Sequence, residues 1–407
     1  MGAGGETQDI GGLPSPRGPY SVGCIETEVK CKSSPHGKFT CMIYYPGESK
    51  DIIKNAGPEW LSEAHASALG AMNLGSILGE GFARFLMGSL SKVATAGARV
   101  RATYNLVPKY LKESWPTAAF SHGLTGWRHV NSSFCTEIAS YGCVVVVPEH
   151  TDGSACLAMS GDKILVEYIS WDKVKKPELE AAGLNAEQVA IAGRDWRRAQ
   201  LDIRIAEIHA ALDAVNSILT STLNTPFAHT HSNVALLGQS FGGATITSAA
   251  IRSKRFSHLC IYDPWFENDG DSLYPVRPSD FQTKVYHIKK AALWRNGKSS
   301  LWKIAKKNTE RLAHVICLND QSSALIFHDA PFCDHYAQTD ANFVFEKVGA
   351  LAFIYRAIKG GSSSSRNKDG ENIKEEKVDP EVALVDAMDK TLALLKDWFP
   401  SDVVVSS

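Results

Sequence analysis

The residues of this chain that are best placed to do chemistry form the segment Gly238-Gln239-Ser240-Phe241-Gly242-Gly243. The segment follows the apolar run 233–237, which is typical of a buried strand, and leads into the helix-like run 244–251. A serine on a tight, glycine-flanked turn between a strand and a helix exposes its hydroxyl, and the helix N-terminus favours negative charge beside it. This setting predicts that Ser240 is an activated nucleophile.

A serine nucleophile needs a base, a carboxylate that orients the base, and hydrogen-bond donors for the oxyanion. The donors are predicted after the strand-like run 118–120, where the chain continues Ser121-His122-Gly123-Leu124. Such a small-residue loop leaves backbone N–H groups free. We expect the N–H groups of Leu124 and Phe241 to form the oxyanion hole.

Two carboxylates are candidates for the orienting group. Asp263 directly follows the strand-like run 259–262, and Asp320 follows the run 315–318. Both positions are at the carboxyl end of an expected strand, where the chemistry of α/β sheets is found. The spacing alone therefore leaves both residues open.

Two histidines are candidates for the base. His335 lies beyond the apolar run 324–327, and His328 follows that run directly. The order Ser240, Asp263, His335 is the order of the α/β-hydrolases, whereas spacing does not exclude His328. The remaining histidines that we considered are interpreted as polar or packing residues: His122, His150, His258 and His314.

The elements that must position these residues alternate along the chain. Helical stretches separate several of the strand-like runs, and the longest spans 185–219. The alternation predicts an α/β fold with a doubly wound, mostly parallel central sheet flanked by helices, as in the α/β-hydrolases. The expected strands are 38–45, 118–120, 143–147, 233–237, 259–262, 284–288 and 324–327.

We expect a single domain over residues 18–400, preceded by a flexible segment over 1–17. The polar, Gly/Ser-rich stretch 359–378 is predicted to be a disordered surface insertion. The chain from Pro380 onward has the pattern of an amphipathic helix that returns to the core.

The composition argues against a nucleic-acid-binding protein. The 407 residues are 44% hydrophobic. Their net charge is only −1, so the chain has no excess of basic residues that would favour a nucleic-acid partner. The nine cysteines lack C-x-x-C spacing and are predicted to be reduced thiols. The N-terminus has no signal-peptide pattern, which predicts a cytoplasmic protein, and Glu6 stands where an N-myristoylation signal at Gly2 has Ser or Thr.

Several collinear motifs resemble the platelet-activating factor acetylhydrolase family. They are Ser121-His122-Gly123-Leu124 with Trp127-Arg128, the segments 146–155, 238–245 and 335–340, Tyr262-Asp263-Pro264-Trp265, and the early segments 18–24 and 42–46. The resemblance covers residues 18 to 398. It implies a calcium-independent serine phospholipase A2 that removes the acetyl, short or oxidised sn-2 acyl chain of platelet-activating factor and related phospholipids.

The resemblance also implies roles for individual residues. Ser240 corresponds to the nucleophile, Asp263 to the acid and His335 to the base, and the N–H groups of Leu124 and Phe241 correspond to the oxyanion hole. No metal or organic cofactor is implied. The chain departs from the family's usual pattern at Gln239, at Thr151 and Gly153, and at Pro264-Trp265, which bears on the shape of the pocket.

Members of this family reach their substrate from a lipid surface. Two apolar helical stretches, 74–87 and 348–358, are therefore predicted to give peripheral membrane contact, although such stripes are more often core. Three other functions remain open: a general carboxylesterase or longer-chain phospholipase, a lipid-binding protein with a vestigial triad, and a metal-dependent hydrolase that uses His150 and Asp152.

Overall fold

A computed structural model describes the chain over residues 13–48, 57–109, 114–224, 233–269, 272–282, 285, 287–297, 312, 325–330, 333, 335–344 and 378–399.

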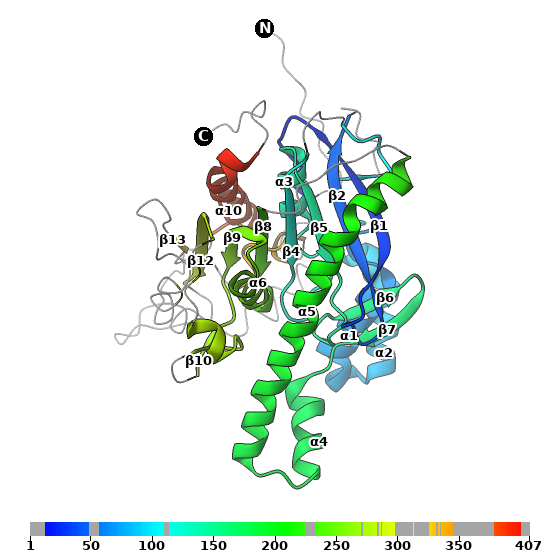
Figure 1. Cartoon of the computed structure of the whole chain (residues 1–407). Coiled ribbons are helices and arrows are strands. Elements are labelled where there is room, and N and C mark those ends of the chain that lie inside the picture. The colour runs from blue at the N-terminus through cyan, green and yellow to red at the C-terminus, as the bar shows by residue number, and fades with distance from the viewer. Residues whose placement is uncertain are drawn as a thin grey trace, which may run out of the picture.

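A nine-stranded sheet runs through the middle of the molecule (Figure 1). Its strands lie in the order β13 (Leu325–Ala330), β12 (Lys290–Asn296), β9 (Phe256–Tyr262), β8 (Val234–Gln239), β4 (Thr117–Ser121), β5 (Val144–Pro148), β2 (Lys38–Gly47), β1 (Ser21–Lys30) and β3 (Thr103–Tyr104). The strands from β13 to β5 are parallel, whereas β2 is antiparallel to both β5 and β1. The carboxyl ends of β4, β8, β9 and β12 therefore meet at one edge of the sheet.

Helices cover both faces of the sheet. The helices α5 (Ala186–Leu223) and α6 (Phe241–Arg252) pack with one set of strand residues, including Ile43, Val146 and Leu236. The helices α3 (Ser132–Ser140) and α10 (Pro380–Leu395) pack with the alternate set, including Met42 and Val147. Successive strand residues point to opposite faces, so strands buried on both sides read as continuous apolar runs.

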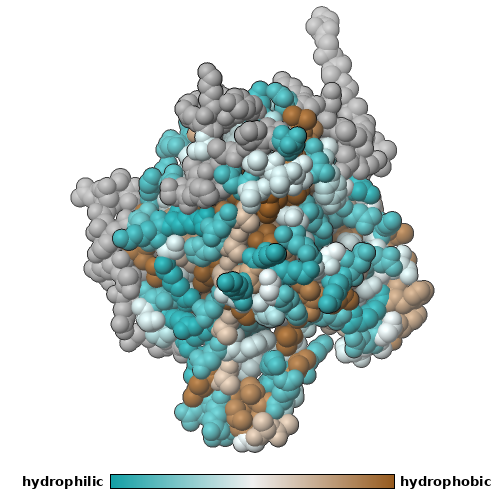
Figure 2. All heavy atoms as spheres, turned by 45° about the vertical axis from the view of Figure 1, so that its right-hand side comes forward, coloured by the Kyte–Doolittle hydropathy of each residue, from teal (hydrophilic) through white to brown (hydrophobic). Residues whose placement is uncertain are grey.

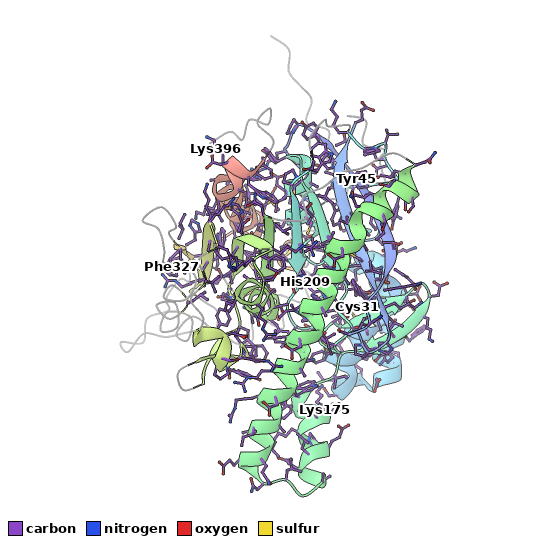
Figure 3. All side chains as sticks on the ribbon, in the orientation of Figure 1. Cys31, Tyr45, Lys175, His209, Phe327 and Lys396 are labelled. Atoms are coloured by element: carbon purple, nitrogen blue, oxygen red, sulfur yellow. The ribbon has the colours of Figure 1, made fainter. Side chains whose placement is uncertain are left out.

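The helix α5 crosses one face of the sheet and extends well beyond it (Figure 1). It begins with a capping box in which the Asn185 side chain accepts from the Gln188 N–H and the Gln188 side chain accepts from the Asn185 N–H. Its last residue, Leu223, is followed by Asn224, whose backbone has the left-handed conformation that is common where helices end. His209 on α5 and Cys31 after β1 line a shallow surface groove where the helix passes the strand (Figure 3).

The other described elements lie around this core. They are α1 (Glu63–Leu78), α2 (Glu80–Ala94), the hairpin of β6 (Leu157–Ser160) and β7 (Lys163–Glu167), a π-helical turn at Trp171–Lys175, α4 (Lys176–Ala181), the pair β10 (Glu267–Asp269) and β11 (Ser272–Tyr274), a 3-10 turn at Pro278–Gln282, α8 (Asp340–Phe343), and a 3-10 turn at Lys396–Trp398.

The predicted fold class is confirmed, and so are the long helix on 185–219 and the helix that begins at Pro380. The strand expected at 284–288 is wrong, because the strand between β9 and β13 is formed by 290–296. Val285 and Ile288 are nevertheless buried, since the non-strand chain here packs on the core. The strand β1 was not among the expected strands.

Eight of the nine cysteines are buried free thiols, as predicted, and Cys317 lies outside the described residues. The expected helix at 348–358 and all but Val378 of the expected insertion at 359–378 also lie outside them, as do the first twelve residues. The single-domain assignment stays a prediction. Among the helices that the structure describes, none is long and apolar enough to span a bilayer.

Candidate active site

Ser240 lies at the turn between β8 and α6 with φ 56° and ψ −119°, a backbone conformation that non-glycine residues rarely adopt. Its N–H donates to the Tyr262 carbonyl at 3.0 Å, and its carbonyl accepts from the Trp265 N–H at 3.0 Å. These bonds to the chain after β9 hold the strained residue in place, which is how such conformations persist at functional sites.

The glycines of the turn are required by close backbone approaches. A Cβ at Gly242 would lie 1.9 Å from the Ser121 carbonyl oxygen, and a Cβ at Gly238 would lie 2.5 Å from the Gly242 carbonyl oxygen. The helix α6 can therefore begin against the end of β4 only because these side chains are missing.

Asp263 and His335 come together at the same edge of the sheet. Gln239 of β8 is in register with Tyr262 of β9, so Asp263 follows β9 level with the turn at Ser240. The Asp263 side chain is fully buried, and its Oδ2 lies 2.5 Å from His335 Nδ1. Its Oδ1 accepts from the Asn296 N–H at the end of β12. The carboxylate thus fixes one ring nitrogen of His335 and leaves Nε2 on the other side of the ring.

The loop that carries His335 is held by buried polar contacts. The side chains of Gln338 and Asn296 exchange two hydrogen bonds, of 2.6 and 2.9 Å. The Asp340 carboxylate accepts from Ser132 Oγ at 2.6 Å and from the Ser133 N–H at 3.0 Å. It therefore satisfies one of the backbone N–H groups that have no partner within the first turn of α3. Burial raises the pKa of Asp340 to about 6. These contacts tie the loop to β12 and α3.

Gln239 makes a direct contact with the same loop. Its Nε2 donates to the His335 carbonyl at 2.9 Å and lies 3.5 Å from His335 Nε2. A neutral amide therefore lies beside the ring nitrogen that faces away from Asp263. Within the part of the chain that the structure describes, Ser240 Oγ has no hydrogen-bond partner. The hydrogen bond between Ser240 Oγ and His335 Nε2 is therefore not formed in this structure.

The backbone after β4 lies against Ser240. A Cβ at Gly123 would be 3.0 Å from Ser240 Cβ and 2.5 Å from Gln239 Oε1. Among the described residues, the N–H groups of Leu124 and Phe241 donate to no protein acceptor. The Phe241 N–H is one of the free donors of the first turn of α6. Two unpartnered donors thus border the serine.

The rival residues are placed differently. His328 lies on β13, where its ring is 4.7 Å from the ring of Trp294, and burial lowers its pKa. Asp320 lies outside the described residues. The structure therefore brings His335 against Asp263 and gives His328 a packing contact with Trp294.

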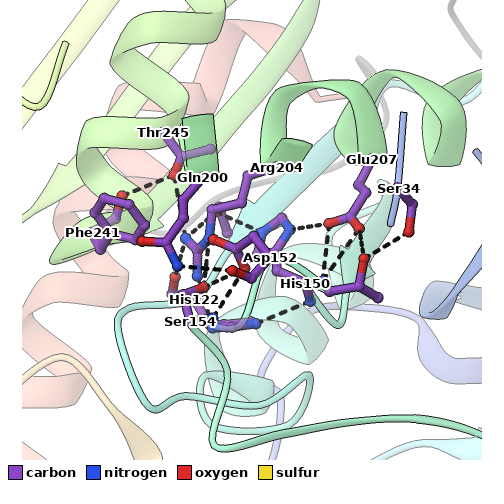
Figure 4. A network of polar contacts seen from close by, with 12 residues as sticks. Ser34, His122, His150, Asp152, Ser154, Gln200, Arg204, Glu207, Phe241 and Thr245 are labelled. Carbon is purple, nitrogen blue, oxygen red and sulfur yellow. Dashed lines mark hydrogen bonds and ion pairs between the residues drawn. The ribbon is translucent and has the colours of Figure 1, made fainter. Parts of the chain in front are cut away.

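A buried polar network joins α5 to the loop that follows β4, here called the β4 loop, and to the chain that follows β5 (Figure 4). Its centre is Arg204 on α5, which is 0% exposed. Arg204 Nη1 donates to the His122 carbonyl at 2.9 Å and to Thr245 Oγ1 at 3.2 Å, and Nε lies 3.2 Å from Asp152 Oδ2. The guanidinium carbon also lies 4.7 Å from the Phe241 ring. One cation therefore joins the β4 loop to the first turn of α6.

The second part of the network is a chain of serine, histidine and glutamate. Ser121 Oγ lies 2.9 Å from His150 Nε2, and His150 Nδ1 lies 2.9 Å from Glu207 Oε2. Thr151 Oγ1 bonds to the other Glu207 oxygen at 2.5 Å. Ser121 is 0% exposed, so this arrangement has no access for a substrate.

Burial decides the charges of this network. It raises the pKa of Glu207 to about 8 and holds the pKa of His150 well below its usual range. Burial, with Arg204 nearby, lowers the pKa of His122 to about 3. At neutral pH, Glu207 and both histidines are therefore uncharged, and Arg204 with Asp152 is the ion pair of the network.

Replacement of Glu207 by glutamine is expected to change the pH dependence of stability. The folded pKa of about 8 is above the unfolded value of 4.5, so the folded protein binds the extra proton between these two pH values. The contribution of Glu207 is present below pH 4.5 and is lost as pH rises through 8, with a slope of at most about 1.4 kcal/mol per pH unit. Denaturant unfolding of wild type and Glu207→Gln from pH 5 to 9 measures the difference.

The expected result is that the free energy of unfolding falls more steeply with pH in the wild type than in Glu207→Gln. The two proteins should be closest in stability at pH 5, the acidic end of the series, because a glutamine resembles the neutral acid, and they should diverge as pH rises towards 8. A constant difference across the whole pH range would contradict the neutral state of Glu207.

His150 and Asp152 do not form a metal-ligand pair in this structure. Both ring nitrogens of His150 are in hydrogen bonds to Ser121 and Glu207, and Asp152 contacts Arg204 and Ser154. Within the described ranges, no cluster of three or more His, Cys, Asp or Glu side chains has the arrangement of a metal site.

Sequence reasoning missed the polar face of α5. Four polar residues of α5 recur at helical spacing and are buried on the same face as the apolar residues Leu201 and Ile208: Arg197, Gln200, Arg204 and Glu207. Charged residues on the core-facing stripe of a long helix are the signal that could have found them.

Comparisons with known proteins identify the family and the fold of this chain. Residues 6–359 match the sequence model of the family described as platelet-activating factor acetylhydrolase, isoform II. A platelet-activating factor acetylhydrolase of Gallus gallus is 27% identical over 288 residues, which are 67% of this chain and 65% of that protein. The protein of that name from Cavia porcellus is 29% identical over 292 residues, 65% of this chain and 58% of that protein. The chain thus spans about three fifths of the length of these relatives.

Among solved structures, a ferulic acid esterase from Streptomyces cinnamoneus superposes with a TM-score of 0.57 and 15% identity, over 97% of this chain and 95% of that one. At this identity the likeness concerns the fold, which is that of the α/β-hydrolases. With a family match that spans most of its residues, the chain belongs to the platelet-activating factor acetylhydrolase, isoform II, family.

Proposed function

We propose that this protein is a serine esterase of the phospholipase A2 type, with Ser240 as nucleophile, His335 as base and Asp263 as the orienting acid. The observation that carries the proposal is the arrangement at the strand ends: a strained Ser240 beside two unpartnered N–H groups, and a His335 that a buried carboxylate holds at 2.5 Å. The family match and the esterase fold of the structural neighbour support the same chemistry.

In the proposed mechanism, Ser240 Oγ attacks the ester carbonyl carbon while His335 Nε2 takes its proton. The N–H groups of Leu124 and Phe241 stabilise the oxyanion of the tetrahedral intermediate. His335 then gives the proton to the leaving alkoxide, and an acyl-Ser240 intermediate remains. Water, deprotonated by His335, releases the carboxylic acid and restores the serine. The Ser240–His335 contact is expected to close when substrate binds, since such contacts are often long in free enzymes.

The proposed substrate is a glycerophospholipid with an acetyl, short or oxidised acyl chain at sn-2, such as platelet-activating factor. The curated relatives bear the name of that activity, which is the support for this narrower assignment. A long-chain phospholipase or a general carboxylesterase would use the same catalytic groups.

Comparing sn-2 chain lengths tests the substrate. We expect kcat/KM for phosphatidylcholines to be highest with an acetyl chain and to fall as the sn-2 chain lengthens. Ser240→Ala, assayed in parallel, gives the background rate. A preference for long chains, or for simple alkyl esters over phospholipids, would contradict the proposed substrate. Absence of any Ser240-dependent hydrolysis would instead favour a lipid-binding protein.

We further propose that the apolar surface of α1 and α2 contacts lipid. Four large side chains that follow one another around the junction of these helices are exposed: Ile77 at 76%, Leu78 at 41%, Phe82 at 55% and Phe85 at 69%. On the face that Figure 2 shows, hydrophobic areas in brown lie among hydrophilic areas in teal. Exposed aromatic and aliphatic residues on amphipathic helices are suited to shallow insertion at a membrane surface.

The paired change Phe82→Ser and Phe85→Ser is expected to weaken binding to phosphatidylcholine vesicles about tenfold or more, because each exposed ring contributes one to three kcal/mol when it is buried in lipid. Vesicle co-sedimentation measures the effect. The control is Val382→Ser, which removes an apolar side chain that is 60% exposed on α10. Equal losses for both proteins would contradict a lipid-binding face on α1 and α2.

A further inference from the structure

Arg197 on α5 is a buried cation without an acidic partner. The residue is 6% exposed, and its Nη1 donates to Gln200 Oε1 at 2.7 Å. Within the ranges that the structure describes, no carboxylate forms an ion pair with it. Arg204, two turns further along the same helix, is paired with Asp152. A buried guanidinium without a counter-charge is unfavourable, so its presence needs an explanation.

Three aromatic side chains lie around this guanidinium, and two of them are next to the nucleophile. Its central carbon lies 4.3 Å from the ring centre of Trp196, 5.2 Å from that of Trp265 and 5.8 Å from that of Phe241. Phe241 directly follows Ser240, and the Trp265 N–H donates to the Ser240 carbonyl. Two of the three rings that contact Arg197 therefore belong to residues that contact or adjoin the candidate nucleophile.

The local charges leave an excess of positive charge. Burial lowers the pKa of Arg204, and the positive charge of Arg197 lowers it further. Asp152 neutralises one of the two cations, and Glu207 is uncharged at neutral pH because of its raised pKa. A bound anion would restore the balance. The planar guanidinium, with donors on two sides, matches the oxygens of a phosphate group.

We propose that Arg197 binds the phosphodiester of the glycerophospholipid substrate and so selects phospholipids over neutral esters. The inference rests on the proposed function. In such a substrate, a few bonds separate the sn-2 ester from the phosphate, so an ester carbonyl held at Ser240 keeps the phosphate near the edge of the site. The aromatic faces around Arg197 are already occupied by its guanidinium, so they hold a cation of the protein rather than the substrate's trimethylammonium group.

The test compares two esters that differ in the phosphate. One is 1-alkyl-2-acetyl-glycerophosphocholine, and the other is the matching 1-alkyl-2-acetylglycerol, both in neutral detergent micelles. Arg197→Gln is expected to lower the ratio of kcat/KM for the phosphate-bearing ester to that for the neutral ester about ten- to a hundredfold, mainly through KM. Arg197→Lys keeps the positive charge but lacks the paired, planar N–H donors of the guanidinium, so the ratio is expected to fall by less.

Arg198→Gln is the matched control. It removes a positive charge from the next position of α5, where the side chain lies 3.5 Å from Asp195, and should leave the ratio unchanged. Thermal unfolding checks that each variant is folded. If Arg197→Gln does not fold, the comparison of the two esters is made with Arg197→Lys. An unchanged ratio, or an equal loss on both esters, would overturn the phosphate site. Wild type that cleaves neither ester would contradict the proposed function instead.

Protection of Ser240 against a fluorophosphonate tests binding without turnover. We expect glycerophosphocholine to slow labelling of the wild type and to have much less effect on Arg197→Gln. Protection by inorganic phosphate alone would indicate a site for free anions and would overturn the assignment to the substrate's phosphodiester.

Discussion

Ser240→Ala is expected to lower kcat/KM for short-chain phospholipid esters about 10⁴- to 10⁶-fold, which corresponds to about 5–8 kcal/mol of transition-state stabilisation. The reason is that the proposed covalent step has no other nucleophile: the attacking oxygen is lost, while the binding surfaces remain. Steady-state hydrolysis by highly purified protein measures the loss.

The fold should tolerate this change. Ser240 is 7% exposed, and its side chain has no partner among the described residues, so alanine removes no contact of the resting state. Thermal unfolding midpoints within a few degrees of each other are the control. A folded Ser240→Ala protein with substantial activity would show that the nucleophile is another residue.

His335→Ala is expected to reduce kcat/KM by about 10⁴-fold or more, because serine is a weak nucleophile without a base. The matched variant is His328→Ala. His328 packs on the Trp294 ring at 4.7 Å, so its loss should lower stability by about 1 kcal/mol and leave turnover within a few-fold of wild type. Both variants are assayed with the acetyl substrate and by thermal unfolding.

The pair of histidine variants separates the two candidates for the base. If His328→Ala is the inactive protein and His335→Ala retains activity, the base is assigned wrongly. If neither variant loses activity, the proposed serine mechanism is wrong as a whole.

The turn at Ser240 could be predicted because its signal is local. An apolar strand, a serine between glycines and a following helix are adjacent in the chain, and the glycines are needed where α6 begins against Ser121. The same holds for α5, whose start is defined by the Asn185–Gln188 capping box and whose length follows from helical periodicity.

The partners of Ser240 depend on sheet order, which local patterns do not contain. Asp263 lies beside the turn because β9 pairs with β8 in a register that aligns Tyr262 with Gln239. His335 reaches Asp263 because β12 separates β9 from β13 and the following loop folds back over the strand ends. From spacing alone Asp320 and His328 remained open, and the family resemblance decided between the candidates.

The buried side of α5 could not be assigned from its residue types. A periodicity of apolar residues shows which face of a helix packs inward, yet charged residues on that face are ordinarily expected in solvent. Here Arg204 and Glu207 are fully buried because the β4 loop and the chain after β5 supply their hydrogen bonds. Those partners are far apart in sequence. The misplaced strand at 284–288 has a similar cause, since Val285 and Ile288 are buried by tertiary packing without strand pairing.

Mass spectrometry of the protein after reaction with a fluorophosphonate tests the central claim most directly, because the reagent labels only an activated serine. The proposed mechanism predicts a single adduct on the peptide that contains Ser240, formed rapidly in the wild type and absent from both Ser240→Ala and the His335→Ala protein. An adduct on a different residue, or no adduct on folded wild-type protein, would contradict it.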